Sequence, residues 1–175
     1  MQDIYVSARS DEGEWLPAAP LPGTINSKGR EENPFLHSDG VSLYFASDGL
    51  PGMGGMDLFV SRKQDDGTWS EPENLGYPIN THGNENSLQV FADGSHAIFA
   101  TDRSDAGNYD LWEFELPVEV SASAVALWTG EVRDKSGEAI EAKVQVLDLS
   151  GRLLSTQNSD PIDGQFTLSF TTAED

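Results

Sequence analysis

The sequence predicts an all-β chain made of two parts. Seventeen glycines, nine prolines and many short apolar runs among 175 residues are typical of short strands joined by turns. A spacing of 54 residues recurs in the sequence up to residue 116, and it is lost after Pro117. We therefore expect similar β-units in the first part and a different strand plan in the second.

The repeat is carried by several landmarks. The segment "SDGVSLYFASD" at 38–48 returns as "ADGSHAIFATD" at 92–102, and each copy begins with an Asp-Gly turn. In such a turn the aspartate can accept backbone N–H bonds and the glycine can supply a positive φ. An aspartate that opens a strand and a tryptophan late in the unit recur as well. The repeated residues are Asp39, Gly40, Asp93 and Gly94 in the turns, Asp3, Asp57 and Asp110 at the strand starts, and Trp15 and Trp69.

One unit is expected to hold four antiparallel strands. The pattern predicts strands at 33–37, 43–46 and 57–62, with a weaker fourth strand near Trp69 and Pro72. Four short strands in every 40–55 residues are the signature of a β-propeller blade. We therefore expect residues 31–83 to form one blade.

The next unit is expected to be incomplete. Strands are predicted at 86–90, 97–100 and 110–114, after which the chain runs into Pro117 instead of a turn and a tryptophan. The edge of the strand at 110–114 is then left bare, or is covered by residues 118–128, by a second copy of the chain, or by a segment preceding residue 1.

The aspartate that recurs in each unit is interpreted as structural. A catalytic acid normally occurs once, whereas Asp3, Asp57 and Asp110 hold equivalent places. An aspartate after a glycine-rich loop can accept backbone N–H bonds and close that loop. Cation binding and catalysis remain the alternatives.

The first part also resembles a known family. The segments "ENPFLHSDGVSLYFASD", "GGMDLFVSRK" and "GTWSEPENLGYPIN" are similar to TolB-type, WD-like propeller repeats, as found in Gram-negative envelope proteins that carry an OmpA-like domain. The resemblance covers roughly residues 1–116. It implies a partial propeller of about two four-stranded blades, used as a binding scaffold without catalysis. The propeller blades are assigned to 1–117.

The second part, 118–175, resembles a carboxypeptidase-regulatory-like domain. The matching pieces are "TGEVRDKSGEAIEAKVQVLD" and "DGQFTLSF", and strands are expected at 124–132, 142–147 and 165–170. The resemblance implies a transthyretin-like β-sandwich, here truncated, without peptidase residues. In the envelope proteins of the first resemblance this module follows the propeller.

These resemblances imply a binding module associated with the outer membrane in the periplasm, with envelope proteins or cell-wall material as partners. Both ends of the chain look cut, so the flanks are expected to hold further blades, a secretion signal and an OmpA-like domain. The alternative is a carbohydrate-binding or glycosidase-type propeller whose site lies in the missing blades. A glycosidase needs a carboxylate pair in a pocket, and the sequence singles out no such pair.

Composition narrows the partners. The chain has 10 basic and 30 acidic residues, a formal net charge of −20, which disfavours nucleic acid and anionic lipid. No apolar run approaches the roughly 20 residues of a membrane span, so no insertion by this segment is expected. The truncated blades are expected to self-associate through exposed edges, with Phe45, Phe59, Phe99 and Trp112 on the exposed faces.

No cofactor or catalytic residue is expected. Weak candidates for a cation site are the clustered acids Asp102, Asp105 and Asp110, joined by Glu113, because hard cations take oxygen ligands. Their spacing matches no EF-hand. The three histidines, His37, His82 and His96, form no zinc-binding pair.

Overall fold

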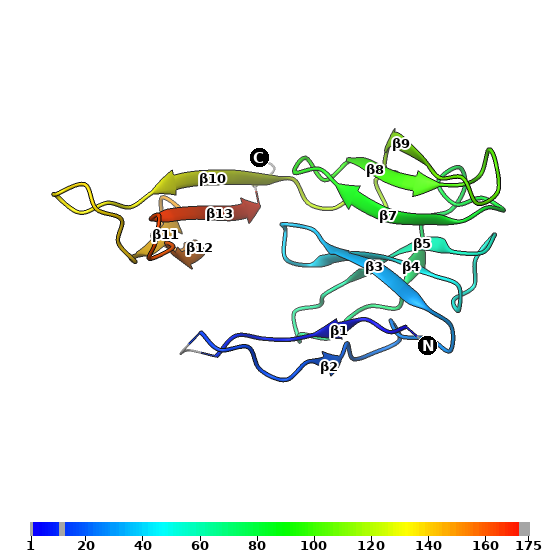
Figure 1. The fold of residues 1–175 in the computed structure, drawn as a ribbon, viewed down its shortest axis with the longest axis horizontal. Helices are drawn as coiled ribbons and strands as arrows, with labels where there is room; N and C mark the ends of the chain where they lie inside the picture. The colour runs from blue at the N-terminus through cyan, green and yellow to red at the C-terminus, as the bar shows by residue number, and fades with distance from the viewer. Residues whose placement is uncertain (1, 11–12, 172–175) are drawn as a thin grey trace. The chain divides into compact units, whose positions relative to one another are not determined.

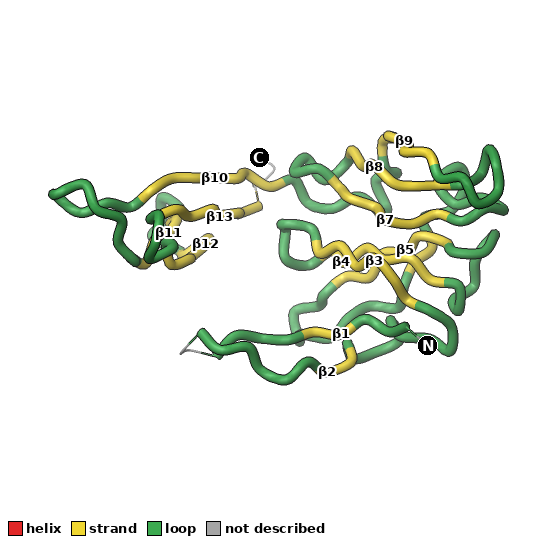
Figure 2. Tube along the Cα trace, viewed as in Figure 1, coloured by secondary structure: helices red, strands yellow, loops and turns green. Residues whose placement is uncertain are grey.

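The computed structural model describes residues 2–10 and 13–171, and every regular element in these ranges is a strand (Figures 1 and 2). The chain divides into two compact units, 1–122 and 123–175. The all-β class predicted from the sequence is confirmed. The described residues include no helix that could cross a membrane.

The centre of the first unit is a four-stranded antiparallel sheet. Its strands are β3 (Glu31–Leu36), β4 (Ser42–Ser47), β5 (Asp57–Arg62) and β6 (Glu73–Asn74), in that order across the sheet. All residues of β4 are buried, as are all but the last of β5, because both faces of the sheet are covered. The four strands expected within 31–83 are therefore present.

A second sheet follows with three strands. It consists of β7 (Glu85–Val90), β8 (His96–Thr101) and β9 (Asp110–Glu115), again antiparallel and in chain order. Among the described residues no strand pairs with the outer side of β9. The three strands expected within 84–116 are present, and their outer edge is bare.

A short sheet precedes both. β1 (Tyr5–Val6) pairs with β2 (Ala19–Pro20), and Tyr5 faces Pro20 just as Phe59 faces Asn74 in the pair β5–β6. Tyr5 lies 54 positions before Phe59, and Pro20 lies 54 positions before Asn74. β1 and β2 therefore repeat the last two strands of the four-stranded sheet.

The repeat extends to the backbone. β3 and β7 are each interrupted by an irregularity, between Glu32 and Phe35 in one and between Asn86 and Gln89 in the other. Asn33 and Ser87 have φ values of 50° and 55° there, unusual for residues other than glycine. Each strand bends at the same place, and the sequence pattern did not predict the bend.

Two apolar clusters lie on opposite faces of the four-stranded sheet. Alternate residues of β4 and β5 point to opposite sides, as the period of a strand requires. The cluster towards β7 and β8 holds Tyr44, Ala46, Leu58, Val60, Leu88, Val90, Ala97 and Phe99 among its members. The cluster towards β1 holds Ile4, Leu21, Ile25, Leu43, Phe45 and Phe59.

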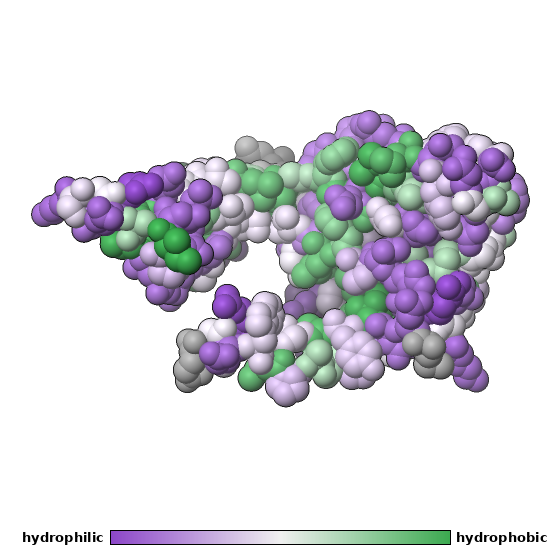
Figure 3. Space-filling view, in the orientation of Figure 1, coloured by the Kyte–Doolittle hydropathy of each residue, from purple (hydrophilic) through white to green (hydrophobic). Residues whose placement is uncertain are grey.

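This arrangement corrects one expectation. Phe45, Phe59 and Phe99 are 1–2% exposed, because the neighbouring sheets cover them. Trp112 on β9 is 42% exposed and its neighbour Leu111 is 74% exposed. Apolar residues are visible over the region of β8 and β9 in Figure 3. The exposed apolar surface of the three-stranded sheet therefore lies on its outer strand β9, whereas Phe99 on β8 is covered.

The segment after β9 belongs to the first unit. The Tyr44 hydroxyl donates to the Val120 carbonyl at 2.6 Å, and the Ala122 N–H donates to the Gly94 carbonyl at 2.9 Å. Burial raises the pKa of Tyr44 to about 12. The division between units thus falls after residue 122 instead of after Pro117, and 118–122 pack beside the β7–β8 turn instead of pairing with β9.

The second unit contains two two-stranded antiparallel sheets. β10 (Val125–Glu131) pairs with β13 (Gln165–Thr171), and β11 (Lys143–Leu147) pairs with β12 (Leu153–Asn158). β10, β11 and β13 overlap the three predicted strands, whereas β12 was not predicted. Its sequence, "LLSTQN", ends in polar residues and lacks a clear alternation.

Two turns of the second unit share one design. In "DKSGE" and "DLSGR" the side chains of Asp134 and Asp148 each accept bonds from the N–H and hydroxyl of the serine two positions later. These bonds lower the pKa of both carboxyls, that of Asp148 to about 2. The aspartates are therefore engaged in holding the turns.

Candidate functional site

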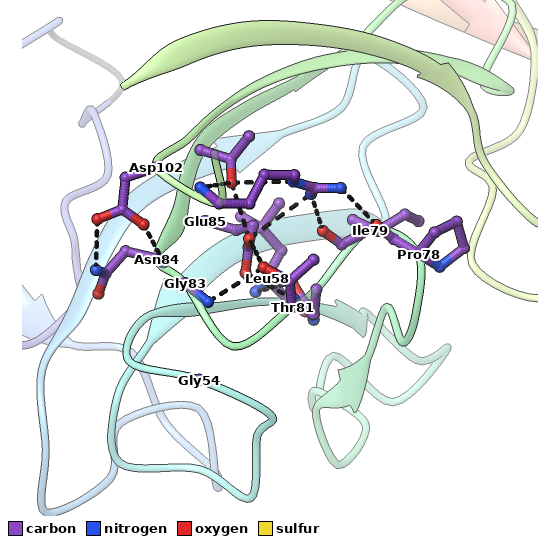
Figure 4. A network of polar contacts seen from close by, with 12 residues as sticks. Gly54, Leu58, Pro78, Ile79, Thr81, Gly83, Asn84, Glu85 and Asp102 are labelled. Atoms are coloured by element: carbon purple, nitrogen blue, oxygen red, sulfur yellow. Dashed lines mark hydrogen bonds and ion pairs between the residues drawn. The ribbon is translucent and has the colours of Figure 1, made fainter. Parts of the chain in front are cut away.

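Glu85, at the start of β7, belongs to a network of buried polar contacts (Figure 4). Its side chain is fully buried and accepts bonds from the Thr81 N–H at 3.0 Å, the Thr81 hydroxyl at 2.6 Å and the Thr101 hydroxyl at 2.9 Å. The Arg103 guanidinium lies 3.6 Å away. A buried carboxylate is tolerated here because both oxygens have donors.

Arg103 joins this carboxylate to the edge of the sheet. Its guanidinium donates to the carbonyls of Pro78 at 2.8 Å and Ile79 at 2.5 Å. It also lies over the rings of Phe99, at 5.2 Å, and Trp112, at 4.7 Å. The cation is thus held between two aromatic rings and two backbone carbonyls, an arrangement that suits a planar guanidinium.

Asp102 and Asn84 form a second part of the network. The Asn84 N–H and side-chain amide donate to the two carboxylate oxygens of Asp102 at 2.6 and 2.9 Å. The Gly107 N–H donates to Asp102 at 3.0 Å. These bonds, that from the Asn84 backbone first, lower the pKa of Asp102. The carboxylate fixes the start of β7 and the loop after β8.

Asn80 acts as a clamp on β5. Its carboxamide accepts from the Leu58 N–H at 2.8 Å and donates to the Leu58 carbonyl at 2.8 Å. The Leu75 N–H also donates to that carbonyl, at 3.0 Å. Asn80 is fully buried. A buried side chain therefore takes the place of a strand residue where β6 ends.

The same network occurs between β1–β2 and the four-stranded sheet. Glu31 accepts bonds from Ser27 and Ser47, Arg30 donates to Asp48, and Asn26 clamps Ile4. Each residue precedes its counterpart by 54 positions. A group that recurs at each interface between sheets supports the architecture of the repeat. The largest difference is Gly49, which stands where the second copy has Arg103.

The repeated aspartates differ in their surroundings. Asp57 is buried and accepts bonds from the N–H groups of Met53, at 3.0 Å, and Gly54, at 3.1 Å. In Asp3, the atom Oδ1 is buried and finds no hydrogen-bond partner among the described residues. Asp110 is exposed. Asp57 closes the loop before it, whereas the shorter spacing of 53 residues places Asp110 after a different loop.

The Asp-Gly turns are alike in both copies. Asp39 accepts bonds from two backbone N–H groups, at 2.9 Å each, and Asp93 accepts two at 3.0 Å. Gly40 and Gly94 have φ values of 76° and 77°, which glycine adopts without a steric penalty. The turns place these four residues at the tips of the β3–β4 and β7–β8 hairpins.

The two repeated tryptophans have different environments. Trp69 is partly buried and packs against the apolar cluster that contains Phe45 and Phe59. Trp15 is 68% exposed, and the Arg9 guanidinium lies 5.4 Å from the centre of its ring. Packing between sheets thus describes Trp69, whereas Trp15 presents its ring on the surface.

The acidic candidates for a cation site are not gathered around a common point. Asp102 is engaged by Asn84 and Gly107, whereas Asp105 and Asp110 are exposed. Within 2–10 and 13–171, no cluster of three acidic, histidine or cysteine side chains is placed to hold a metal ion.

His37 is a buried polar residue whose role the sequence did not indicate. The Asp39 N–H donates to its Nδ1 at 3.2 Å, so Nε2 carries the hydrogen and donates to the Phe91 carbonyl at 3.0 Å. His37 thereby links the end of β3 to the β7–β8 hairpin. The sequence offered one signal for this contact, because His37 and Phe91 lie 54 residues apart, which is the spacing of the repeat.

The buried glutamates were also missed. Glu31 and Glu85 each follow the pattern Ser/Thr-x-Gly-x-Glu, at 27–31 and 81–85, and the hydroxyl residue supplies two of the bonds to the carboxylate. The repeated pattern could have identified them, although an acidic residue at a strand start usually indicates an exposed position.

Comparison of the chain with protein-family models, with curated proteins and with solved structures finds no match.

Proposed function

We propose that the first unit is part of a TolB-type β-propeller that serves as a non-enzymatic binding scaffold, and that the second unit is a truncated carboxypeptidase-regulatory-like sandwich. In this proposal the protein acts at the bacterial envelope, in the periplasm and associated with the outer membrane. Its partners are envelope proteins or cell-wall material.

The observation that carries the proposal is the repeated network around the two buried glutamates. Glu31 and Glu85 are 2% and 0% exposed, and hydroxyl residues at equivalent positions of the repeat donate to both. Polar groups used in this way hold neighbouring sheets together in a fixed spacing. A rigid array of repeated sheets supports a scaffold, whose loops and edges are free to carry recognition.

The net charge of −20 disfavours nucleic acid as a partner. It also sets the conditions of a test, because an acidic surface retains basic proteins unspecifically at low salt. Binding measured at about 0.15 M salt, where the screening length is about 8 Å, reduces that background.

The test is capture from detergent-solubilised envelope extract of a Gram-negative bacterium, with the 175-residue chain immobilised. Enrichment of a small set of envelope proteins or of peptidoglycan fragments, relative to an acidic control protein of similar charge, supports the scaffold role. Release of reducing sugar from envelope polysaccharide by the chain would contradict it.

One observation favours carbohydrate binding as a second candidate. Trp15 is exposed with a cation beside its ring, and an exposed aromatic face can stack on a sugar. A glycan array probed with the chain and with Trp15→Ala separates the two. Specific glycan signals that disappear in the variant would replace the protein scaffold by a carbohydrate-binding module.

A further inference from the structure

A cavity of about 210 Å³ lies beside the outer strand β9 in the first unit. Its lining is mainly apolar and includes Ile79, Phe99, Trp112 and Phe114, together with the charged residues Arg103 and Glu113. Arg103 is already engaged by Pro78 and Ile79. The space beside these aromatic rings is therefore shaped for an apolar group.

The other sheet interface contains a tryptophan that packs on the corresponding apolar cluster. Trp69 packs against the cluster that includes Ile25, Phe45 and Phe59. The counterparts of these three residues are Ile79, Phe99 and Trp112, which line the cavity. The last pair follows from strand register, because Phe45 faces Phe59 and Phe99 faces Trp112. The cavity thus lies against the counterparts of three residues of the cluster on which a tryptophan packs in the preceding repeat.

The backbone of β9 lacks the clamp found on the two earlier strands. By the same register, Leu111 corresponds to Leu58, whose N–H and carbonyl are bound by Asn80. Ile4 is bound in the same way by Asn26. Within the part of the chain that the structure describes, no side chain clamps Leu111. An exposed edge of this kind is a template for an added strand.

The segments that fill the two earlier places share one pattern. They are "WLPAAPLPGTIN" at 15–26 and "WSEPENLGYPIN" at 69–80, and both read Trp-x5-Leu-x3-Ile-Asn. Leu21, Ile25, Leu75 and Ile79 are all buried, at 9%, 0%, 4% and 2% exposure. The tryptophan packs on the apolar cluster in the second segment, and the asparagine binds the backbone in both.

We propose that β9 and its cavity form an acceptor site for a separate extended segment with the pattern Trp-x5-Leu-x3-Ile-Asn. The segment adds a fourth strand to β7–β8–β9, its tryptophan enters the cavity, and its asparagine clamps Leu111. The inference rests on the contacts around β9 and does not depend on the envelope role.

Charge defines one further position of the segment. In the four-stranded sheet Val60 faces Glu73, the fifth residue of the pattern. The counterpart of Val60 on β9 is Glu113, because Tyr44 faces Val60 and Ile98 faces Glu113. Opposite charges directly across two strands are stabilising and like charges are destabilising. The site therefore selects a lysine or arginine at the fifth position.

The experiment uses the full chain and peptides that correspond to residues 68–82, titrated by calorimetry. The peptide with Glu73→Lys should bind, and the unchanged peptide should bind about threefold more weakly because glutamate then faces Glu113. Adding Asn80→Asp to the Glu73→Lys peptide should weaken binding about tenfold, since the clamp loses its donor. These peptide variants leave the folding of the chain untouched.

The reciprocal variant is made in the chain. Glu113→Lys should reverse the preference, so that the unchanged peptide binds more tightly than the Glu73→Lys peptide. Amide exchange provides a second measurement, since the Leu111 N–H should become protected when the Glu73→Lys peptide is bound.

Three results would overturn the proposal. One is the absence of saturable binding of the Glu73→Lys peptide up to about 1 mM. Another is a peptide preference that Glu113→Lys leaves unchanged. The third is a stable dimer of the chain that excludes the peptide, which would place a second copy on the edge of β9.

Discussion

Two sheet interfaces of the first unit use the same polar network with different charges. In the interface between β1–β2 and the four-stranded sheet, the bonds that Glu31 accepts from described residues come from hydroxyl and N–H groups. In the interface with β7–β8–β9, Glu85 has the same donors and also Arg103 at 3.6 Å. Neutral donors alone are thus compatible with a buried carboxylate in this fold.

The difference follows from the space available at one position. Gly49 stands where the second interface has Arg103, and a Cβ atom built on Gly49 would overlap Ser27 Oγ and the backbone of Gly29. The first interface is too tight for any side chain there, and Trp69 and Leu50 pack on its apolar cluster. The second interface admits the arginine and keeps a cavity beside it. At the first interface, the backbones of Gly29 and Gly49 lie so close together that no charged side chain can occupy the place of Arg103.

Replacing each of the two glutamates should give the largest losses in the free energy of unfolding, and the losses at the two interfaces should differ. Glu85→Ala removes the acceptor of two threonines and the anion beside the Arg103 guanidinium, and it should lower the free energy of unfolding by roughly 3–5 kcal/mol. Glu31→Ala leaves only neutral donors and should cost roughly 1–3 kcal/mol. Urea unfolding followed by circular dichroism measures both.

The double variant Glu85→Ala/Arg103→Ala is the control for the role of charge. It should be less destabilised than the sum of the single variants, because the unpaired cation is removed together with its acceptor. Equal losses in Glu31→Ala and Glu85→Ala, with additive effects in the double variant, would show that the guanidinium contributes nothing to the difference.

The asparagine clamps should show the next largest effect. Asn80→Ala removes two bonds to Leu58 in a fully buried place and should cost roughly 2–3 kcal/mol. Asn26→Ala should cost about 1 kcal/mol, since Asn26 is only partly buried and water can reach the freed groups of Ile4. Thermal unfolding of the two variants in parallel would test this order, and a larger loss for Asn26→Ala would contradict it.

Arg103→Ala should have an intermediate effect of roughly 1–2 kcal/mol. The variant loses bonds to the carbonyls of Pro78 and Ile79 and the contact with two rings, while Glu85 keeps its three other donors. The fluorescence of Trp112 should change as well, because the cation leaves its ring face. Unchanged emission together with unchanged stability would contradict the contacts of Arg103.

Most of the strand plan of the first unit was accessible from the sequence. The period of 54 residues and the alternation of apolar residues place β3, β4, β5, β7, β8 and β9 to within two residues. Periodicity identifies which residues alternate, but it does not show how closely two sheets approach. The burial of Phe45, Phe59 and Phe99 therefore could not be predicted without knowing that another sheet covers each face.

The polar interior was less accessible. Glu31, Glu85 and His37 are charged or titratable types whose usual place is the surface, and their burial depends on hydrogen-bond partners that lie up to 54 residues away in the chain. The loop-closing bonds of Asp57 could be predicted because their donors are three and four residues away. Asp110 differs because it follows Asp57 by 53 positions instead of 54. Recognising the repeated aspartate does not by itself reveal the effect of this one-residue change on the loop before it.

The smallest expected effect concerns Asp48 and Asp102, which hold equivalent places at the two interfaces. Asp102 is bound by the neutral Asn84, and Asp48 by the backbone and the guanidinium of Arg30. These bonds lower the pKa of both carboxyls below the usual value of about 3.8. In acid the unfolded chain therefore binds more protons at these positions, so their contribution is complete above about pH 5 and is lost as the pH falls through the folded pKa.

The variants Asp48→Asn and Asp102→Asn separate the two kinds of partner. The stability difference between each variant and the unmodified chain should shrink between pH 6 and pH 3. Raising the salt concentration to about 1 M at pH 6 should reduce the difference for Asp48→Asn, because its ion pair with Arg30 is exposed and screened. The difference for Asp102→Asn should hold, since its donors are neutral. Urea midpoints at the two pH values and two salt concentrations measure these effects, and an equal response to salt at both positions would mean that the Arg30 charge adds nothing to the neutral hydrogen bonds.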